Sequence, residues 1–209
     1  MELKDKKAFI TGGSSGIGLS LARSLSARGA HVFIGARRAE GLDTALLEMK
    51  RVQVSPLQRC GTVQLDVTKP DQVTRAVENL NSELGLPDLV INSAGVVHPG
   101  YIQDLDLDVF RWMMEVNYFG TVYTTQAFLK GMIERRSGII VNIASLTAAQ
   151  SVFGYGAYGP SKFAVRAYTD TLRIEMKPVT TESAAAAATP TTIPISGETP
   201  QTLSACAEQ

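Results

Sequence analysis

A serine, a tyrosine and a lysine stand at spacings that suit acid–base chemistry on a carbonyl group. "YGPSK" places Tyr158 and Lys162 four residues apart, and Ser145 comes thirteen residues before the tyrosine. If a helix begins near Tyr158, both side chains lie on one helical face. A phenol ordinarily ionises only near pH ~10, but a nearby ammonium stabilises the phenolate. With Ser145 hydrogen-bonding the substrate oxygen, the three residues suit proton donation to a carbonyl that receives a hydride.

Such a tyrosine–lysine pair also occurs on solvated helix faces, so a second feature is needed. "ITGGSSGIG" (10–18) places a glycine-rich turn between an apolar run and a helical pattern. This order is typical of a dinucleotide site, in which the pyrophosphate lies at the helix N-terminus. The spacing is G-x-x-x-G-x-G, and the alternative is an ordinary glycine-rich turn. We expect cofactor contacts from the whole turn: Gly12, Ser14, Ser15, Gly16, Ile17 and Gly18.

The end of the next apolar run indicates which dinucleotide binds. An NAD site needs a carboxylate there, whereas an NADP site needs a cation for the extra phosphate. "GARRAE" places Arg37 and Arg38 at this position, and arginine binds phosphate through two hydrogen bonds. The alternative is that both arginines are solvated surface residues. We predict NADPH, with Arg37 as the main ligand.

Two more strand ends are expected at the same edge of the sheet. Asp66 and Val67 close the third apolar run, where the Asp66 carboxylate could accept from the adenine amino group. Asp66 could equally be a turn or cap residue. "NSAG" closes the fourth run and offers backbone to the adenine ribose through Asn92, Ala94 and Gly95. Ligands of open α/β sheets lie across the carboxyl ends of the strands.

The elements that must position these residues alternate along the chain. Continuously apolar strands followed by helices predict an α/β fold, with a doubly wound parallel sheet covered by helices on both faces. The expected strands are 7–11, 31–36, 62–67, 88–95 and 138–145, and the expected helices are 17–29, 40–52, 70–84, 106–134 and 161–176.

The pattern ends after Pro178. Residues 179–209 are rich in Thr, Ser, Ala and Pro, include the run Ala184–Ala188, and show no apolar run of strand length. We therefore expect a catalytic domain over 1–178 and an irregular or incompletely represented segment over 179–209. A sheet of six or seven strands would need at least one further strand.

Composition excludes several function classes. The 209 residues balance 20 basic against 20 acidic side chains, which argues against nucleic-acid binding. Two cysteines, Cys60 and Cys206, indicate a reducing compartment. His31 and His98 are too far apart to indicate a metal site, and no metal is expected. No signal peptide or membrane-spanning run is visible, so we expect the chain as given to be soluble.

Taken together, "TGGSSGIG", "NSAG", Asn117, Ser145 and "YGPSK" resemble the classical short-chain dehydrogenases/reductases over about residues 5–178. The resemblance implies that Tyr158 is the catalytic acid–base, that Lys162 assists it and binds the cofactor ribose, and that Ser145 orients the substrate. It also implies that Asn117 holds a water linking the lysine to solvent. Two long helices commonly pair copies of the chain in this family, which implies a homodimer or tetramer.

Within the family, the segments "NYFGTVYTTQAFLKGMIERRSGIIV" and "FGYGAYGPSKFAVRAYTDTLRIEMKP" look most like 3-ketodihydrosphingosine reductases. That resemblance implies NADPH-dependent reduction of a long-chain keto-base lipid at the cytosolic face of the endoplasmic reticulum membrane, with membrane association in the full-length protein. Gly41 replaces a lysine found in some members, and the expected cover over the nicotinamide after Pro178 is missing. The alternatives are another short-chain carbonyl or steroid reductase, and a non-catalytic dinucleotide sensor or scaffold.

Overall fold

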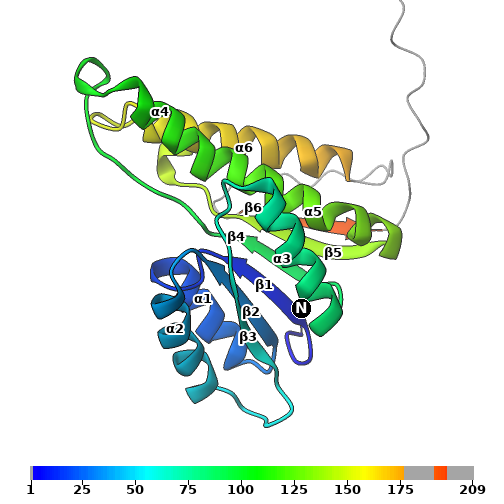
Figure 1. Cartoon of the computed structure of the whole chain (residues 1–209). Helices are drawn as coiled ribbons and strands as arrows, with labels where there is room; N and C mark the ends of the chain where they lie inside the picture. Colours follow the sequence, from blue (N-terminus) through cyan, green and yellow to red (C-terminus); the bar gives the residue numbers. More distant parts are fainter. Residues whose placement is uncertain (1, 177–190, 197–209) are drawn as a thin grey trace, which may run out of the picture.

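The computed structural model describes residues 2–176 and 191–196. Five parallel strands form one sheet in the order β3-β2-β1-β4-β5, and β6 completes its edge (Figure 1). The predicted doubly wound parallel fold is therefore confirmed. The parallel strands are β1 (Lys7–Thr11), β2 (His31–Ala36), β3 (Cys60–Gln64), β4 (Leu89–Asn92) and β5 (Ser137–Asn142).

Helices cover both faces of this sheet. One face carries α1 (Gly16–Ser26) and α2 (Ala39–Arg51). The other face carries α3 (Pro70–Glu83), α5 (Gly120–Arg135) and α6 (Tyr158–Glu175), whereas α4 (Leu107–Met113) packs against α6. A π-helical segment, η2 (Met114–Phe119), joins α4 to α5, so that the predicted helix 106–134 is continuous but locally widened. Short 3-10 turns lie at η1 (Ile102–Asp104) and η3 (Leu146–Ala148).

Three strands end earlier than the sequence predicts: β3 ends at Gln64, β4 at Asn92 and β5 at Asn142. Gln64 of β3 pairs with Ala36, the last residue of β2, and Asn142 of β5 pairs with Asn92, the last residue of β4. One more backbone hydrogen bond follows each pair, from the Leu65 N–H to the Ala36 carbonyl (3.0 Å) and from the Ile143 N–H to the Asn92 carbonyl (2.9 Å). Asp66 and Ser145 therefore lie in loops at the carboxyl edge rather than at strand ends.

The segment 179–209, expected to be irregular or incompletely represented, contributes one strand to the sheet. β6 (Thr191–Ser196) pairs antiparallel with β5, from Ser137 opposite Ser196 to Asn142 opposite Thr191. Its sequence, "TTIPIS", contains β-branched residues but also a proline, which cannot donate to a central ladder and is confined to edges. β6 is such an edge strand. Ala184–Ala188 and Cys206 lie outside the described residues.

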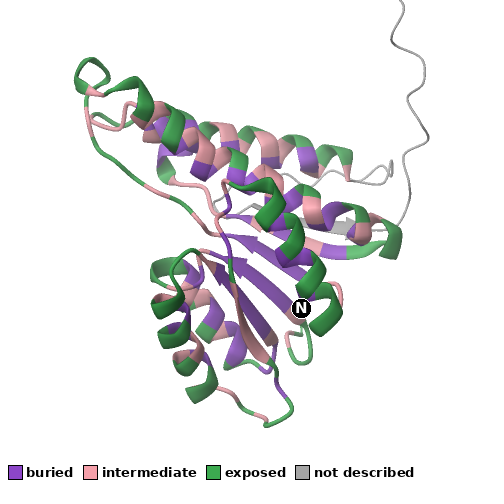
Figure 2. Cartoon of the chain, viewed as in Figure 1, coloured by how far each residue is buried: buried purple, intermediate pink, exposed green. Residues whose placement is uncertain are grey.

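The core forms two layers separated by the sheet, as the buried strands in Figure 2 show. Phe9 and Phe128 meet on the α3–α5 face with ring centroids 5.4 Å apart. In β5 the side chains alternate, with Ile140 buried on the α5 face while Ile139 and Val141 are half-buried with the α1 cluster. This rigid centre fixes the strand ends on which the site depends.

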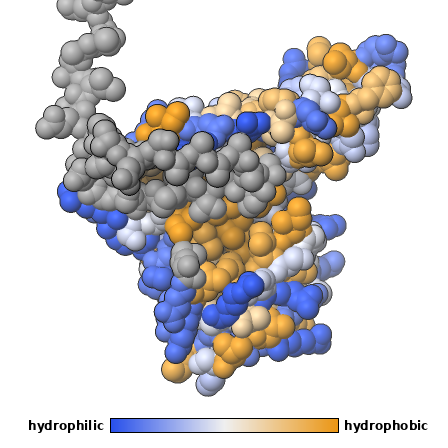
Figure 3. All heavy atoms as spheres, turned by 180° about the vertical axis from the view of Figure 1, so that it is seen from behind, coloured by the Kyte–Doolittle hydropathy of each residue, from blue (hydrophilic) through white to orange (hydrophobic). Residues whose placement is uncertain are grey.

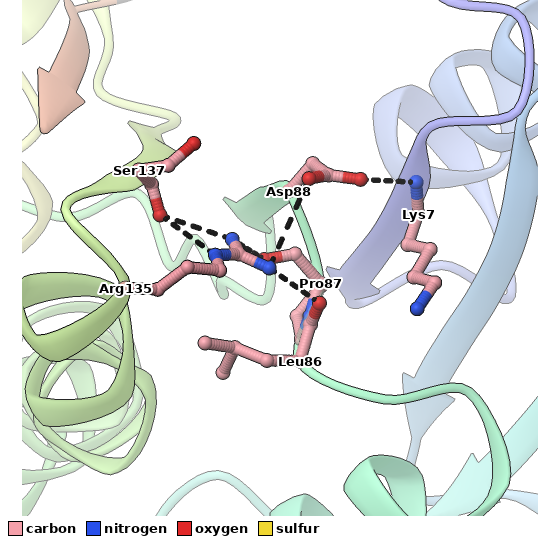
Figure 4. A network of polar contacts seen from close by, with 6 residues as sticks. All are labelled: Lys7, Leu86, Pro87, Asp88, Arg135 and Ser137. Atoms are coloured by element: carbon pink, nitrogen blue, oxygen red, sulfur yellow. Dashed lines mark hydrogen bonds and ion pairs between the residues drawn. The ribbon is translucent and has the colours of Figure 1, made fainter.

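Arg135 fastens the amino ends of β4 and β5 (Figure 4). Its guanidinium donates to the carbonyls of Leu86 (2.8 Å), Pro87 (2.7 Å) and Ser137 (3.1 and 3.0 Å), and lies 3.8 Å from the carboxylate of Asp88. One side chain thus closes the end of α5 against the loop before β4.

We expect Arg135→Ala to lower the free energy of unfolding by about 2 kcal/mol, because several charge-assisted hydrogen bonds are lost at once. Chemical denaturation of the full chain measures this loss. Lys130→Ala, an exposed change on the same helix, is the matched control. An equal effect of both variants would contradict the role given to Arg135.

Candidate active site

A cavity of about 740 Å³ lies across the carboxyl ends of the parallel strands. β1 and β4 are neighbours in the sheet, but the chain runs from β1 to β2 on one side and from β4 to β5 on the other. Such a reversal of direction opens a crevice at the carboxyl ends of the two strands. The glycine turn, both arginines, the loops after β3, β4 and β5, and the start of α6 all line this cavity. All but one of the predicted cofactor-binding residues are lining residues: Gly12, Ser14, Ser15, Gly16, Ile17, Gly18, Arg37, Arg38, Asp66, Val67, Ala94, Gly95, Tyr158 and Lys162.

The glycines of the first turn are required by its geometry. Gly12 has φ +66°, and a Cβ there would lie 2.7 Å from Cα of Ala94. A Cβ on Gly18 would lie 2.3 Å from the Gly12 carbonyl oxygen, so only glycine lets α1 approach the strand end. Gly16 differs, because a Cβ there would meet nothing within 4 Å and would point into open space. The turn therefore holds room beside Gly16 that the chain itself does not fill.

This room suits a pyrophosphate. The first N–H groups of α1 have no partner within the helix, and its N-cap residue Ser15 makes no capping hydrogen bond through its side chain. A helix N-terminus of this kind favours an anion. The donor set and the space at the turn therefore fit a dinucleotide.

Arg37 and Arg38 stand at the far end of the cavity, and both are exposed. The backbone of Arg37 is held by Gln64, whose side-chain amide donates to the Arg37 carbonyl at 2.9 Å. Asp66 uses one carboxylate oxygen to accept from the backbone N–H (3.0 Å) and the hydroxyl (2.9 Å) of Thr68. One oxygen of Asp66 thus has the role of a turn residue, as the alternative interpretation expects. Asp66 also lines the cavity.

Tyr158 and Lys162 occupy the first turn of α6 and line the same cavity. The Lys162 ammonium lies 5.9 Å from the centre of the Tyr158 ring and donates to the Ile143 carbonyl at 2.9 Å. The lysine is 6% exposed, and this burial lowers the pKa of its ammonium to about 8. Holding this cation beside the tyrosine therefore costs desolvation free energy in the folded protein.

Asn117 lies in the π-helical segment and is fully buried. Its side-chain oxygen accepts from the Val96 N–H (2.8 Å), and its amide donates to the Val96 carbonyl (3.0 Å) and to the Ser161 hydroxyl (2.9 Å). Ser161 in turn donates to the Tyr158 carbonyl at 2.7 Å. Both amide hydrogens are therefore in use, so a water at this residue would have to bind through an oxygen.

Asn92 is the predicted cofactor ligand that does not line the cavity. Its side chain is buried and donates to the Thr125 hydroxyl (3.0 Å) and to the Asn142 side-chain oxygen (2.8 Å). Asn142 continues this chain of hydrogen bonds to Thr169 of α6 (2.8 Å). The Asn92 side chain therefore binds neighbouring elements, and its backbone carbonyl accepts from the Ile143 N–H at 2.9 Å.

Ser145 lies next to the lining residue Ala144 but does not itself line the cavity. It is the N-cap of η3, and its hydroxyl oxygen accepts from the Thr147 N–H at 3.2 Å. A hydroxyl that accepts in this way keeps its own hydrogen for donation. The placement is thus compatible with a donor role, which stays a prediction.

Two supporting residues were missed by sequence reasoning. The Thr11 hydroxyl accepts from the N–H groups of Ser93 and Ala94, both at 3.2 Å, and so ties the loop after β4 to the end of β1. Ser161 links Asn117 to the backbone of Tyr158. Both lie within the quoted motifs, but only the folded chain shows what their hydroxyls contact.

In the described part of the chain, no helix has the length and apolarity to span a membrane, and no three His, Cys, Asp or Glu side chains form a metal-binding group.

Comparison with known proteins supplies an independent view. Residues 6–201 match the family model described as short chain dehydrogenase. The chain is 37% identical over 179 residues to a 3-dehydrosphinganine reductase of Danio rerio, which covers 85% of this chain and 54% of the relative. The chain thus spans about half the length of that curated relative.

Solved structures agree on the fold. A crystal structure of an actinorhodin polyketide ketoreductase with NADPH is 34% identical with a TM-score of 0.78, covering 82% of this chain and 65% of that one. L-sorbose reductase from Gluconobacter frateurii, complexed with NADPH and L-sorbose, is 30% identical with a TM-score of 0.78, covering 84% and 66%.

Proposed function

The chain belongs to the short-chain dehydrogenase family, and from this premise we propose that it catalyses the NADPH-dependent reduction of 3-ketodihydrosphingosine to dihydrosphingosine. As a member of this family, the chain is an oxidoreductase that uses a nicotinamide dinucleotide cofactor. The NADPH-dependent reduction is supported by the cavity, which Tyr158 and Lys162 line together with the glycine turn and two arginines. The similarity to a 3-dehydrosphinganine reductase supports the choice of substrate.

In the proposed reaction Gly12–Gly18 hold the pyrophosphate, Arg37 and Arg38 the additional phosphate, and Lys162 the nicotinamide ribose. When bound, the reduced nicotinamide supplies a hydride for the carbonyl carbon. Tyr158 gives its phenolic proton to the carbonyl oxygen, and the Lys162 ammonium stabilises the phenolate that remains. Ser145 donates a hydrogen bond to the same oxygen.

Asn117 has a positioning role in this proposal. Through Val96 it holds the loop after β4, and through Ser161 it holds the backbone of Tyr158. A water that links Lys162 to solvent would bind to an oxygen of this residue, since both amide hydrogens are occupied. The phenol can then be reprotonated between turnovers.

The direct test is an assay of the full chain with NADPH and 3-ketodihydrosphingosine. We expect the absorbance of the reduced nicotinamide to fall and the amino alcohol to form. Mass spectrometry detects this product. Tight NADPH binding without turnover of this ketone or of any other would refute catalysis and leave a sensor or scaffold. Faster turnover of steroid, polyketide or sugar ketones would refute the proposed substrate and favour another carbonyl reductase. That function is the second candidate, because the chain is similar to a polyketide ketoreductase and to a sorbose reductase.

We expect Arg37→Ala to weaken NADPH binding by about 10- to 100-fold and to leave NADH binding within about twofold. A charge-assisted contact to the 2′-phosphate contributes about 1.5–3 kcal/mol, and NADH has no such phosphate. Fluorescence titration with both cofactors measures the ratio. Arg38→Ala serves as the comparison and should have the smaller effect. An equal loss of affinity for NADPH and NADH would mean that Arg37 does not bind the 2′-phosphate.

We further propose that copies of the chain pair through α4–α5 and α6, and that the lipid substrate brings the whole protein to the endoplasmic reticulum membrane. Apolar side chains are exposed on these helices: Trp112, Phe119, Phe163 and Ile174. Light scattering of the full chain in solution tests the pairing. Fractionation of cells that express the whole protein tests the location.

A further inference from the structure

A projecting arm of apolar side chains extends from the mouth of the cavity. It consists of the loop after β4 and the loop after β5, over residues 97–107 and 146–156, which we call the two-loop arm. In Figure 3 the arm stands out from the body at the upper right and carries much apolar surface. Of the fifteen large hydrophobic residues exposed among the described residues, seven belong to it: Val97, Tyr101, Ile102, Leu107, Leu146, Val152 and Phe153.

The two loops of the arm are held together by backbone contacts. The Gly100 N–H donates to the Gly154 carbonyl at 2.7 Å, and the Gly156 N–H donates to the Gly100 carbonyl at 3.2 Å. A Cβ on Gly156 would lie 2.7 Å from Cγ1 of Ile102, so the loops approach more closely than larger residues would permit. The arm is therefore a built surface that keeps its apolar side chains outside.

Aromatic rings connect this surface to the proposed catalytic tyrosine. The ring of Tyr158 lies 5.7 Å from that of Tyr155, and Tyr155 is bridged to Gly100. Next to that bridge, the rings of Tyr101 and Phe153 lie 4.9 Å apart. Two ring pairs and the backbone bridge between them thus link the reacting phenol to the arm.

The exposed fractions and charges of the arm indicate what it binds. Phe153 is 86% exposed and Ile102 72% exposed, and an apolar ligand would remove both side chains from water. Residues 96–110 and 143–157 contain no lysine or arginine, so nothing in these stretches attracts an anion. The inner end of this surface lies beside Tyr158, and Val97 of the arm lines the cavity, so a substrate held at Tyr158 is within reach of the arm.

We propose that the two-loop arm binds the aliphatic chain of the substrate, so that the site selects ketones with long hydrocarbon chains. This inference rests on the proposed function. The carbonyl lies at Tyr158, the first methylenes pass Val97 and Tyr155, and the rest of the chain covers Phe153 and Ile102. Each methylene removed from water contributes about 0.8 kcal/mol, so the preference grows with chain length.

The test uses the full chain and a homologous series of 2-amino-3-ketones from short to long. We expect kcat/KM of the wild type to rise with chain length. Phe153→Ser and Ile102→Ser should each lower kcat/KM about tenfold for the long ketone and change it less than about twofold for the short one. The matched control is Leu57→Ser, which is 84% exposed before the amino end of β3, far from the cavity mouth in the fold, and should change neither.

A binding measurement separates this inference from the proposed function. Titration of the NADP-loaded protein with a long-chain amino alcohol should show about tenfold weaker binding to Phe153→Ser than to the wild type. If no ketone is reduced but this difference is found, the proposed reaction fails and the arm remains a chain-binding surface. Equal losses for short and long ketones, or equal affinities of wild type and Phe153→Ser, would overturn the inference. If the only effect of Phe153→Ser is a change of oligomeric state, the inference is likewise overturned. The arm would then be a contact between copies of the chain.

Discussion

Tyr158→Phe is expected to lower turnover by about 10³-fold while leaving the dissociation constant for NADPH within about twofold. The change removes only the hydroxyl, which is the proton donor of the proposed reaction, and general acid catalysis typically contributes about 10²- to 10⁴-fold. The ring remains beside Tyr155 and the Lys162 ammonium, so the cavity keeps its shape. Steady-state kinetics with the long-chain ketone and a separate cofactor titration measure the two quantities.

The matched control is Tyr123→Phe on α5, which does not line the cavity and whose hydroxyl donates to the Glu115 carboxylate at 3.5 Å. It should keep wild-type turnover. Undiminished turnover in Tyr158→Phe would remove the basis of the proposed chemistry, whatever cofactor is bound. A variant that loses NADPH binding as well would instead assign the hydroxyl a structural role.

Local patterns were enough to predict the parallel sheet and most of the cavity. The glycine turn and the first turn of α6 are short motifs whose geometry depends on residues within a few positions, so Gly12, Gly18, Tyr158 and Lys162 lie where their spacing predicts. The strand ends were harder to place, because each depends on the length of its neighbour. The last pair of the β2–β3 ladder joins Ala36 to Gln64, the residues at which the two strands end.

The side-chain partners could not be predicted, because they come from elements far apart in the sequence. Asn92 is a polar residue at a strand end, as a ligand would be, yet its amide bonds to Thr125 and Asn142, 33 and 50 residues away. The same holds for Asn117, whose contact with Ser161 spans 44 residues. β6 was missed for another reason, since its mixed run with a proline is acceptable only at an edge.

Lys162→Met is expected to abolish most activity and yet to stabilise the protein. Turnover should fall about 10³-fold, because the phenolate loses its neighbouring cation. At pH 7 the lysine is charged in both the folded and the unfolded chain, and its burial penalty, seen in the lowering of its pKa from 10.5 to about 8, acts fully against folding. Methionine has no such penalty, so the variant should gain about 1–3 kcal/mol in unfolding free energy after loss of the hydrogen bond to Ile143.

The sign of this gain makes it depend on pH in a defined window. Between pH 8 and 10.5 the unfolded wild type binds more protons than the folded protein, so its stability rises with pH. Above that window lysine is neutral in both states, and the advantage of the methionine variant should disappear. Urea denaturation of both proteins without cofactor at pH 7, 9 and about 11 follows the difference. Lys130→Met, an exposed change on α5, should show no gain at any pH. A variant less stable than wild type at pH 7, or a difference that does not change with pH, would show that the fold holds the Lys162 ammonium beside Tyr158 without a net desolvation cost.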